Sequence, residues 1–201
     1  MTEPRTVADR VEQVVPGVWY WSIHDERIDF VSSAFAVSSE GGTILIDPLP
    51  LEPEALAQLG TVGAIILSAG SHQRASWRYR RELGARVYAP ALSKEIEEEP
   101  DERYGDGDVL PGGLRAVFTP GAGTTQHTLL HDHTGAAFVS DLLLQPPGEA
   151  LALCPDEYAH DPAELRRSVE RLLELPFSVL CLAHGLPILD EPKAAIRAAL
   201  G

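Results

Sequence analysis

Short runs of β-branched and aromatic residues, separated by polar turns, open the sequence. The runs cover residues 18–23, 30–37 and 43–46, and the polar segments 24–27 and 40–42 lie between them. Runs of this length and composition, bounded by turn residues, are typical of strands joined by hairpins. The pattern predicts a meander of antiparallel strands in the first 46 residues.

Helical spacing of apolar residues then alternates with short apolar runs. We expect helices at residues 52–59, 73–83 and 92–99, the last one ended by Pro100, and buried strands at 64–67 and 86–89. The second half repeats this order, with strands at 114–119, 127–131, 136–140 and 179–183 and helices at 162–175 and 192–200. In both halves, several strands are followed by a helix and a further strand. This predicts an α/β (α+β) fold, a four-layer αββα sandwich with two facing sheets and helices outside.

The composition predicts a single domain over residues 1–201. Hydrophobic residues make up 44% of the chain, enough to bury a core without disulfides or a structural metal. No internal repeat, low-complexity tract or linker divides the sequence. Folding therefore does not require a metal ion, and a chain that lost metal ligands would keep its fold.

The charge balance limits the partners. Acidic residues outnumber basic ones by 30 to 16, a formal net charge of −14. Such a surface repels nucleic-acid phosphates and anionic membrane faces, so we expect neither as a partner. Residues 95–102 contain part of the acidic excess. This run is either a solvated helix end and loop or an acidic docking surface for a basic partner.

Cysteine usage and the N-terminus predict a cytoplasmic protein. The two cysteines, Cys154 and Cys181, have no metal-finger spacing and suit a reducing compartment. The first ten residues are polar and charged, unlike a signal peptide, and no apolar run approaches the roughly 20 residues that span a bilayer.

Four segments follow one another in an order that is typical of a known family. They are a strand ending in aspartate at residues 42–48, a strand and loop at 64–74, a T-P-G segment at 118–122 followed by a strand and aspartate at 139–143, and L-A-H-G at 182–185. In this order and spacing they resemble the metallo-β-lactamase fold superfamily. The resemblance covers about residues 14–189 and implies the same four-layer sandwich.

The resemblance also implies a site at one edge of the two sheets, where histidines and aspartates hold one or two metal ions, usually zinc. The family pattern T-H-x-H-x-D-H falls on residues 68–74, with His72 on a spacer position. Family ligands are replaced there and after the T-P-G segment, by Ala69, Ser71, Gln73, Arg74 and Ala122. Only Asp141 and His184 match ligand positions. The residues expected to line the old pocket are Ser68, Ser71, Gln73, Arg74 and Ala122.

The replacements argue against the family's metal centre. Zinc is held by imidazole, thiolate and carboxylate groups, three of them plus water in a catalytic site. Alanine supplies no ligand, and Arg74 puts a positive charge where a cation should lie. We expect no zinc pair and no bound cofactor, with a single zinc or other divalent ion on Asp141 and His184 as the alternative. Arg74 is expected to form an ion pair with Asp141, the alternative being that it turns to solvent.

The histidines allow two interpretations each. His72 is a lone ligand or general base, or a helix-start histidine bonded to backbone or water. His184 is a remnant metal ligand or shapes the turn before Gly185. The segment His131-Asp132-His133 has the composition of a turn that projects its side chains to solvent, and His127 reaches the pocket only if its loop folds back.

Three functions remain open at this stage. The leading one is a non-catalytic or strongly altered relative of the hydrolases that binds a small molecule or a protein in the old pocket. The second is a hydrolase of esters, thioesters or lactones with a weak or mononuclear metal site on Asp141 and His184. The third is a metal-free enzyme with His72 and Asp141 as its acid–base pair. Because a fold hosts many chemistries, the site has to decide among them.

Overall fold

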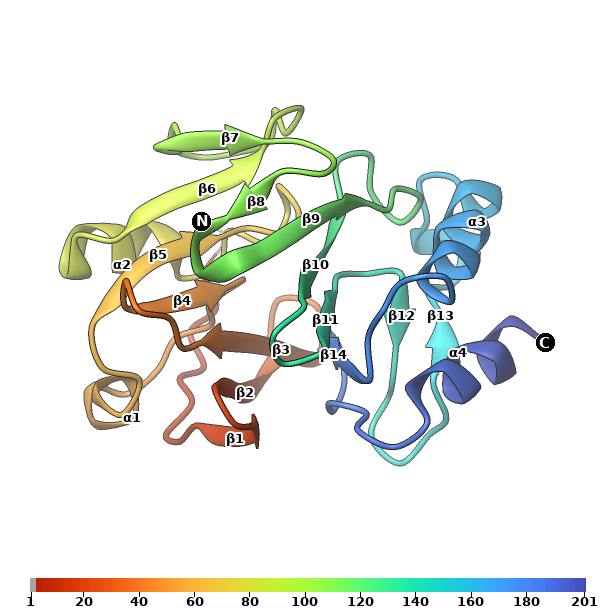
Figure 1. Ribbon diagram of the computed structural model, residues 1–201, viewed down its shortest axis with the longest axis horizontal. Helices are drawn as coiled ribbons and strands as arrows, with labels where there is room; N and C mark the ends of the chain where they lie inside the picture. Colours follow the sequence, from red (N-terminus) through yellow and green to blue (C-terminus); the bar gives the residue numbers. More distant parts are fainter. Residues whose placement is uncertain (1–2) are drawn as a thin grey trace.

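The computed structural model describes residues 3–201, which form two β-sheets packed face to face (Figure 1). The larger sheet has seven strands, which lie side by side in chain order: β1 (Glu12–Val15), β2 (Val18–Asp25), β3 (Phe30–Val37), β4 (Thr43–Ile46), β5 (Val62–Ile66), β6 (Arg86–Pro90) and β7 (Glu102–Tyr104). Strands β1 to β4 are antiparallel, which confirms the predicted meander, and β4 to β7 are parallel.

The second sheet has five strands and comes from the second half of the chain. In spatial order they are β14 (Val179–Leu182), β11 (Ala136–Val139), β10 (His127–His131), β9 (Leu114–Phe118) and β8 (Val109–Leu110). Only β11 and β14 run parallel within it. A small separate ribbon pairs β12 (Leu143–Leu144) with β13 (Ala152–Leu153), and two 3₁₀ turns cover Pro111–Gly113 and Asp156–Tyr158.

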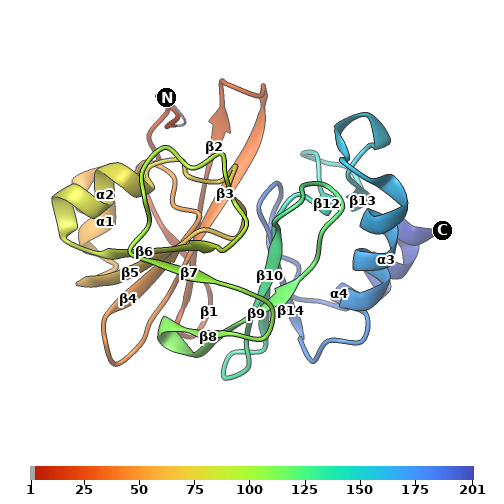
Figure 2. The same ribbon diagram turned by 90° about the horizontal axis from the view of Figure 1, so that it is seen from above.

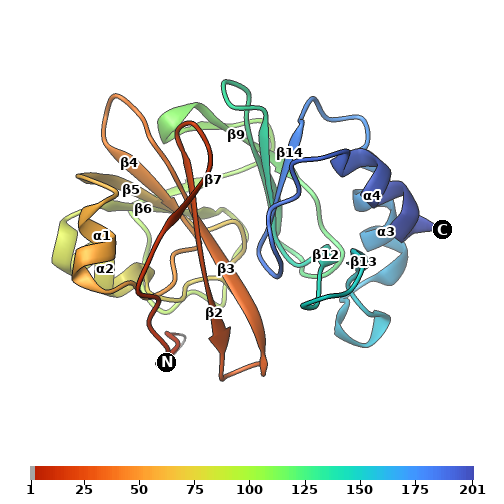
Figure 3. The same ribbon diagram turned by 90° about the horizontal axis from the view of Figure 1, so that it is seen from below.

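Helices cover the outer face of each sheet, which confirms the predicted four-layer sandwich (Figures 2 and 3). Helices α1 (Pro53–Ala57) and α2 (Ser76–Leu83) pack on the seven-stranded sheet, and α3 (Pro162–Leu172) and α4 (Pro192–Leu200) on the five-stranded one. Helix α3 begins where the Asp161 side chain accepts a hydrogen bond from the Glu164 amide, as an N-cap residue does.

Alternate residues of each strand face opposite sides of its sheet. This gives three hydrophobic cores, one under α1 and α2, one between the sheets and one under α3 and α4. On β10, Leu129 faces the core between the sheets, together with Phe35 and Phe138, whereas Leu130 faces α3 and α4. Neighbouring residues of a strand point to opposite faces, so one strand serves both layers. The inward face of β10 also carries His127 at one end and His131 at the other.

The sequence prediction differs from the structure at two helices and at several short strands. The helix expected at residues 92–99 is wrong, because the Gln73 side chain binds the Glu95 carbonyl and the Glu97 amide. Those main-chain groups would otherwise bond within a helix. Helix α2 starts at Ser76, not 73, since Arg74 has a left-handed φ of 43°. The short strands β1, β7, β8, β12 and β13 carry no clear periodic signal in the sequence.

The acidic run at residues 95–102 is an irregular segment whose carboxylates meet arginines. Arg81 pairs with Glu98, Arg103 with Glu99 and Arg80 with Asp101. The charge of the run is thus partly neutralised within the chain. Of the helices in residues 3–201, none has both the length and the apolar character needed to cross a bilayer.

Candidate functional site

Polar side chains gather at one edge of the sandwich, just beyond the carboxyl ends of four strands. Asp47 follows β4, the loop of residues 68–74 follows β5, Asp141 follows β11 and His184 follows β14. The strands β4 and β5 are parallel neighbours, as are β11 and β14, so each pair delivers its loops to the same edge. The Ser33 amide donates to the Ala183 carbonyl at 2.8 Å, which joins the two sheets there.

His72 lies at the centre of this edge and is only 6% exposed. Its Nδ1 is 3.0 Å from Asp47 Oδ2, and its Nε2 is 3.0 Å from Asp141 Oδ1. The predicted alternative of a helix-start histidine bonded to backbone or water is therefore wrong. Asp47 is held in turn by the Ser68 amide at 2.7 Å and by the Ser68 hydroxyl, so the ring orientation is fixed from β4.

His184 approaches the same carboxylate from the other sheet. Its Nδ1 donates to the Val31 carbonyl at 2.9 Å, and its Nε2 is 3.0 Å from Asp141 Oδ1. The two imidazole rings are nearly perpendicular, with centroids 5.8 Å apart. Both Nε2 atoms therefore converge on a single carboxylate oxygen, while both Nδ1 atoms are tied to fixed acceptors.

Asp141 is the shared acceptor of the cluster. Its second oxygen, Oδ2, accepts from Gln126 Nε2 at 2.9 Å. Burial by itself would raise the pKa of Asp141, but His72 and His184 hold that pKa well below its usual range. Its partners are thus two histidines and a glutamine.

The charge of His72 follows from its two carboxylate neighbours. Burial by itself would lower the pKa of His72, but Asp141 and Asp47, opposed by Arg74, raise it to about 9. Carboxylate oxygens only accept hydrogen bonds, so without a metal a ring that bonds both of them carries two protons. A metal ion on Nε2 would take the place of one of these protons.

Arg74 is buried beside the cluster but does not pair with Asp141. Its Nη1 donates to the Ser33 carbonyl at 2.6 Å and to the Asp47 carbonyl at 3.0 Å. The predicted ion pair and the predicted turn to solvent are both wrong, because the nearest acceptors are main-chain oxygens at the ends of β3 and β4. Burial lowers the pKa of Arg74, against the effect of Asp47, Asp141 and Asp25.

A cavity of about 280 Å³ opens beside the cluster and is lined by Asp25, Arg27, Ile28, Ser32, Ser71, His72, Arg74, Asp141 and His184. Of the residues expected to line a pocket, Ser71 and Arg74 do so. Ser68 bonds to Asp47 instead, and Gln73 holds the segment at Glu95 and Glu97. Ala122 packs on the core under α3 and α4. Asp25, Arg27 and Gln126 have polar roles here that no motif in the sequence indicated.

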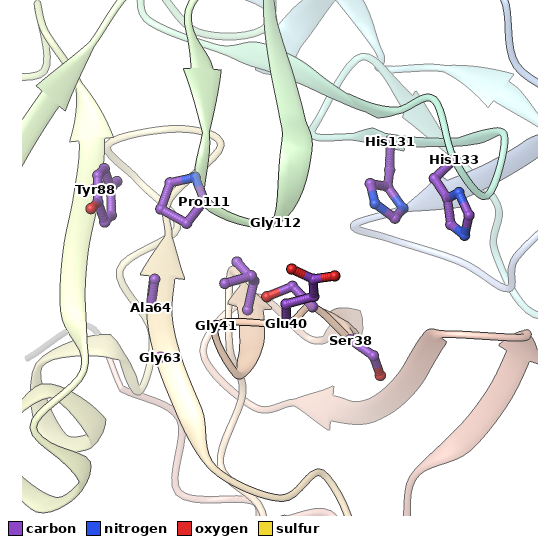
Figure 4. A pocket seen from close by; sticks show the side chains of 12 residues that line it. Ser38, Glu40, Gly41, Gly63, Ala64, Tyr88, Pro111, Gly112, His131 and His133 are labelled. Atoms are coloured by element: carbon purple, nitrogen blue, oxygen red, sulfur yellow. The ribbon is translucent and has the colours of Figure 1, made fainter.

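The remaining histidines lie apart from the cluster. His127 is buried between the rings of Tyr104 and Phe118, and its Nδ1 donates to the Thr125 carbonyl. His131 and His133 border a larger cavity of about 900 Å³ at the opposite ends of the strands (Figure 4). His133 is exposed as the turn composition predicts, but His131 is 6% exposed, so that the solvent prediction is wrong for it.

The His72, Asp141 and His184 side chains form a group that is able to hold a metal ion, since one ligating atom of each lies within 4.8 Å of the others. In residues 3–201 no second group of His, Cys, Asp or Glu comes together in this way. The sequence pattern identified Asp141 and His184 as ligand positions but placed His72 on a spacer.

Comparisons with known proteins agree with the fold. The model of the metallo-beta-lactamase superfamily matches residues 12–193. A metallo-beta-lactamase from Erythrobacter litoralis is 19% identical over 94% of this chain and 89% of its own, with a TM-score of 0.71. The enzyme from Pontibacter korlensis is 15% identical over 95% and 98% of the two chains, with a TM-score of 0.76. Among curated proteins, no sequence matches this chain.

Proposed function

The chain belongs to the metallo-beta-lactamase superfamily, and we propose that it holds one divalent metal ion on His72, Asp141 and His184 and hydrolyses a small ester, thioester or lactone. One observation carries this proposal. The Nε2 atoms of both histidines lie 3.0 Å from the same oxygen of Asp141. His72 thus adds a third ligand to the two that match the family pattern.

The donor set fits one metal ion. Two imidazoles and a carboxylate are a known ligand set of catalytic zinc, with the fourth position left open. Zinc–ligand bonds of about 2.0–2.1 Å place tetrahedral ligands about 3.3 Å apart. The two separations of 3.0 Å are within a few tenths of an ångström of that value. The fit does not extend to a metal pair, because Ala69, Ser71 and Ala122 replace the other histidines.

The surroundings of the histidines also suit a metal site. Metal-binding histidines nearly always donate the other ring N–H to a carboxylate or a carbonyl, which fixes the tautomer and the ring orientation. Here Asp47 is the acceptor for Nδ1 of His72, and the Val31 carbonyl is the acceptor for Nδ1 of His184. A network of this kind holds both Nε2 atoms beside the same oxygen of Asp141 before any ion binds.

The protein groups have distinct parts in the proposed reaction. His72, Asp141 and His184 hold the ion, and Asp47 and Gln126 orient two of these ligands. When bound, a divalent ion supplies Lewis-acid polarisation of a carbonyl and lowers the pKa of a water ligand to about 7. The cavity admits only a small substrate, since about 280 Å³ is at the lower end of ligand-pocket volumes.

A second candidate is a protein that binds a small molecule in this cavity without catalysis. It is supported by the completeness of the hydrogen-bond network, because each ring nitrogen of His72 and His184 already has a protein partner. Buried polar groups that are satisfied in this way need no ion. In this case the cluster serves to hold the two sheets together at the edge.

Metal titration tests the proposal. Chelator-treated protein is titrated with Zn²⁺ at neutral pH, followed by calorimetry and by elemental analysis after gel filtration. We expect one ion per chain, and a loss of affinity of about 100-fold or more in His72→Ala and His184→Ala. His133→Ala, which removes an exposed histidine at the opposite edge, is the matched control and should bind like the wild type.

Three outcomes separate the candidates. No stoichiometric binding, or two ions per chain, would overturn the metal site. One ion per chain together with turnover in a panel of esters, thioesters and lactones supports the hydrolase. One ion or none, without turnover of any member of the panel, favours the binding protein.

A further inference from the structure

A third cavity lies where β7 of the larger sheet meets β9 and β10 of the smaller one. Its volume is about 210 Å³, and it is lined by Pro90, Ala91, Leu92, Tyr104, Gly105, Asp106, Phe118, Thr125 and His127. None of these residues lines the cavity beside His72. A molecule bound here would therefore not depend on a metal ion in the His72 cluster.

His127 is the buried polar ring of this cavity, and one of its ring nitrogens has no protein partner. The residue is 5% exposed, and its Nδ1 lies 3.0 Å from the Thr125 carbonyl oxygen. In residues 3–201 no protein group forms a hydrogen bond with Nε2. Nε2 is also not among the fully covered polar atoms of that range, so it is accessible from the cavity that His127 lines.

The bond to Thr125 fixes which nitrogen of His127 carries the proton. A carbonyl oxygen only accepts hydrogen bonds, so Nδ1 is the protonated nitrogen. Burial lowers the pKa of His127, against the effects of the Thr125 carbonyl and of the Asp106 and Asp108 carboxylates. At neutral pH the ring is therefore uncharged, and Nε2 is a hydrogen-bond acceptor that no protein donor occupies.

Two aromatic side chains flank the imidazole and form walls of the cavity. The ring centroids of Tyr104 and Phe118 lie 5.1 and 5.2 Å from that of His127. An apolar cavity of roughly 150 Å³ is sufficient for benzene. The volume of about 210 Å³ thus admits one six-membered ring with a small substituent.

We propose that this cavity binds a small neutral aromatic molecule with one hydroxyl group, and that the hydroxyl donates to Nε2 of His127. The aromatic ring of such a molecule packs on Tyr104 and Phe118 in the offset or edge-to-face arrangements that aromatic pairs prefer. Its hydroxyl supplies the donor that Nε2 lacks. A hydrocarbon of the same shape would shield Nε2 from water and leave it unsatisfied, which is costly.

The charges at the cavity disfavour an ionised ligand. Asp106 is the carboxylate among the lining residues, and it repels an anion. It is exposed and already accepts from the Phe118 amide at 2.7 Å. An ammonium group would lose its hydration inside the cavity without a buried carboxylate to pair with, which is costly. A neutral hydroxyl has neither cost.

The experiment uses ¹⁵N-labelled full-length protein at neutral pH and follows the imidazole nitrogens of His127 by long-range ¹H–¹⁵N correlation. The probes are phenol, toluene, which has the same shape but no donor, and benzylamine, which is cationic. We expect phenol to bind with a dissociation constant on the order of 1 mM or lower. Saturation with phenol should shift the Nε2 signal of His127, because this nitrogen accepts the new hydrogen bond.

Two substitutions of His127 separate the hydrogen bond from the packing. His127→Leu removes the acceptor, and we expect the affinity for phenol relative to toluene to fall by about 3–10-fold, the effect of one neutral hydrogen bond. His127→Gln keeps an acceptor near the position of Nε2 and should retain more of the preference for phenol. His133→Leu, at an exposed histidine just beyond the other end of β10, is the matched control and should bind like the wild type.

Several results would overturn the proposal. They are the absence of saturable phenol binding, an unchanged ratio of phenol to toluene affinity in His127→Leu, and tighter binding of benzylamine than of phenol. Circular dichroism checks that each variant folds. If His127→Leu does not fold, the wild-type spectrum decides, since bound phenol that leaves the Nε2 signal unshifted contradicts the hydrogen bond.

Discussion

The two edges of the sandwich both place histidines beside a cavity, but the ring nitrogens have different partners. At the edge of Asp47 and Asp141, His72 and His184 contact buried or half-buried carboxylates. At the opposite edge, His131 Nδ1 meets the Thr134 hydroxyl at 2.8 Å, and burial lowers the pKa of that histidine. His133 is exposed, with its ring centroid 6.1 Å from that of His131.

The larger cavity lies at the edge where the histidines contact no carboxylate. The cavity beside His131 holds about 900 Å³, against about 280 Å³ beside His72. Figure 4 shows Glu40, His131 and His133 among the side chains that line the larger one. Glu40 is exposed there, and in the described chain no carboxylate forms an ion pair with either of these two histidines. Convergence of buried ligating atoms, and not volume, therefore distinguishes the candidate site.

The topology gives a reason for this difference. The loops of residues 47, 68–74, 141 and 184 all follow the carboxyl ends of strands that lie in two parallel pairs. The opposite edge consists mainly of tight turns, such as residues 39–42 and 132–135, in which Glu40, Asp132 and His133 are exposed. In open sheets ligands bind at the carboxyl ends of parallel strands, and the His72 cluster follows that rule.

Substitution of one arginine at each edge should give the largest difference in stability. Arg74→Met removes a charged donor from two buried carbonyls, so we expect the free energy of unfolding to fall by about 2–4 kcal/mol. Arg115→Met breaks a half-exposed pair with Asp132, at 3.5 Å, and should cost less than about 1 kcal/mol. Denaturant titration measures both.

The same series tests the ion pair that the sequence predicted. Because Arg74 and Asp141 share no hydrogen bond, the double variant Arg74→Met/Asp141→Ala should equal the sum of the single variants to within about 1 kcal/mol. A larger coupling, or equal losses at Arg74 and Arg115, would mean that the edges do not differ as described.

Substitution of the residue behind one histidine at each edge tests the orientation of the ligands. Asp47→Ala removes the acceptor of His72 Nδ1, and we expect Zn²⁺ affinity to fall by about 10–100-fold, the usual effect of losing such a partner. Thr134→Ala removes the corresponding partner of His131 and should leave the affinity unchanged. Calorimetric titration of both variants makes the comparison, and an unchanged affinity in Asp47→Ala would show that His72 needs no support from β4.

The sequence was sufficient for the layers of the fold because each layer has a local signal. The runs at 30–37 and 43–46 and the helix at residues 192–200 match the observed β3, β4 and α4. The helix at 92–99 was wrong because Gln73, which is distant in sequence, binds the main chain of that segment. Local periodicity contains no information on such contacts.

The site was predictable only where a side chain follows a strand directly. Asp141 and His184 fit that description, and both are in the cluster. His72 was assigned to a spacer because the family pattern fixes which loop residues face the metal, whereas here Asp47 turns this ring inward. Arg74 was given the wrong partner because main-chain carbonyls, which every residue has, leave no trace in the sequence.

The smallest predicted effect concerns one carboxylate near each edge, Asp25 and Asp132. The side chain of Asp25 is fully buried and bound by Arg27 and Ser32, so we expect Asp25→Asn to cost about 1–2 kcal/mol at neutral pH. Asp132→Asn breaks only the half-exposed pair with Arg115 and should cost less than about 1 kcal/mol.

The pH dependence makes this last comparison sharper. Burial by itself would raise the pKa of Asp25, but the hydrogen bonds and charge of Arg27, with help from Ser32, lower it below 3.8. A carboxyl whose pKa is lower in the folded state binds protons more readily when unfolded, so its stabilising effect is present above the unfolded pKa and is lost as the pH falls through the folded one. The difference in unfolding free energy between wild type and Asp25→Asn should therefore stay constant from pH 7 to about 5 and shrink below about pH 4. Denaturant titrations across this range measure it. A difference that grows on acidification would mean that Asp25 is not held as a carboxylate by Arg27.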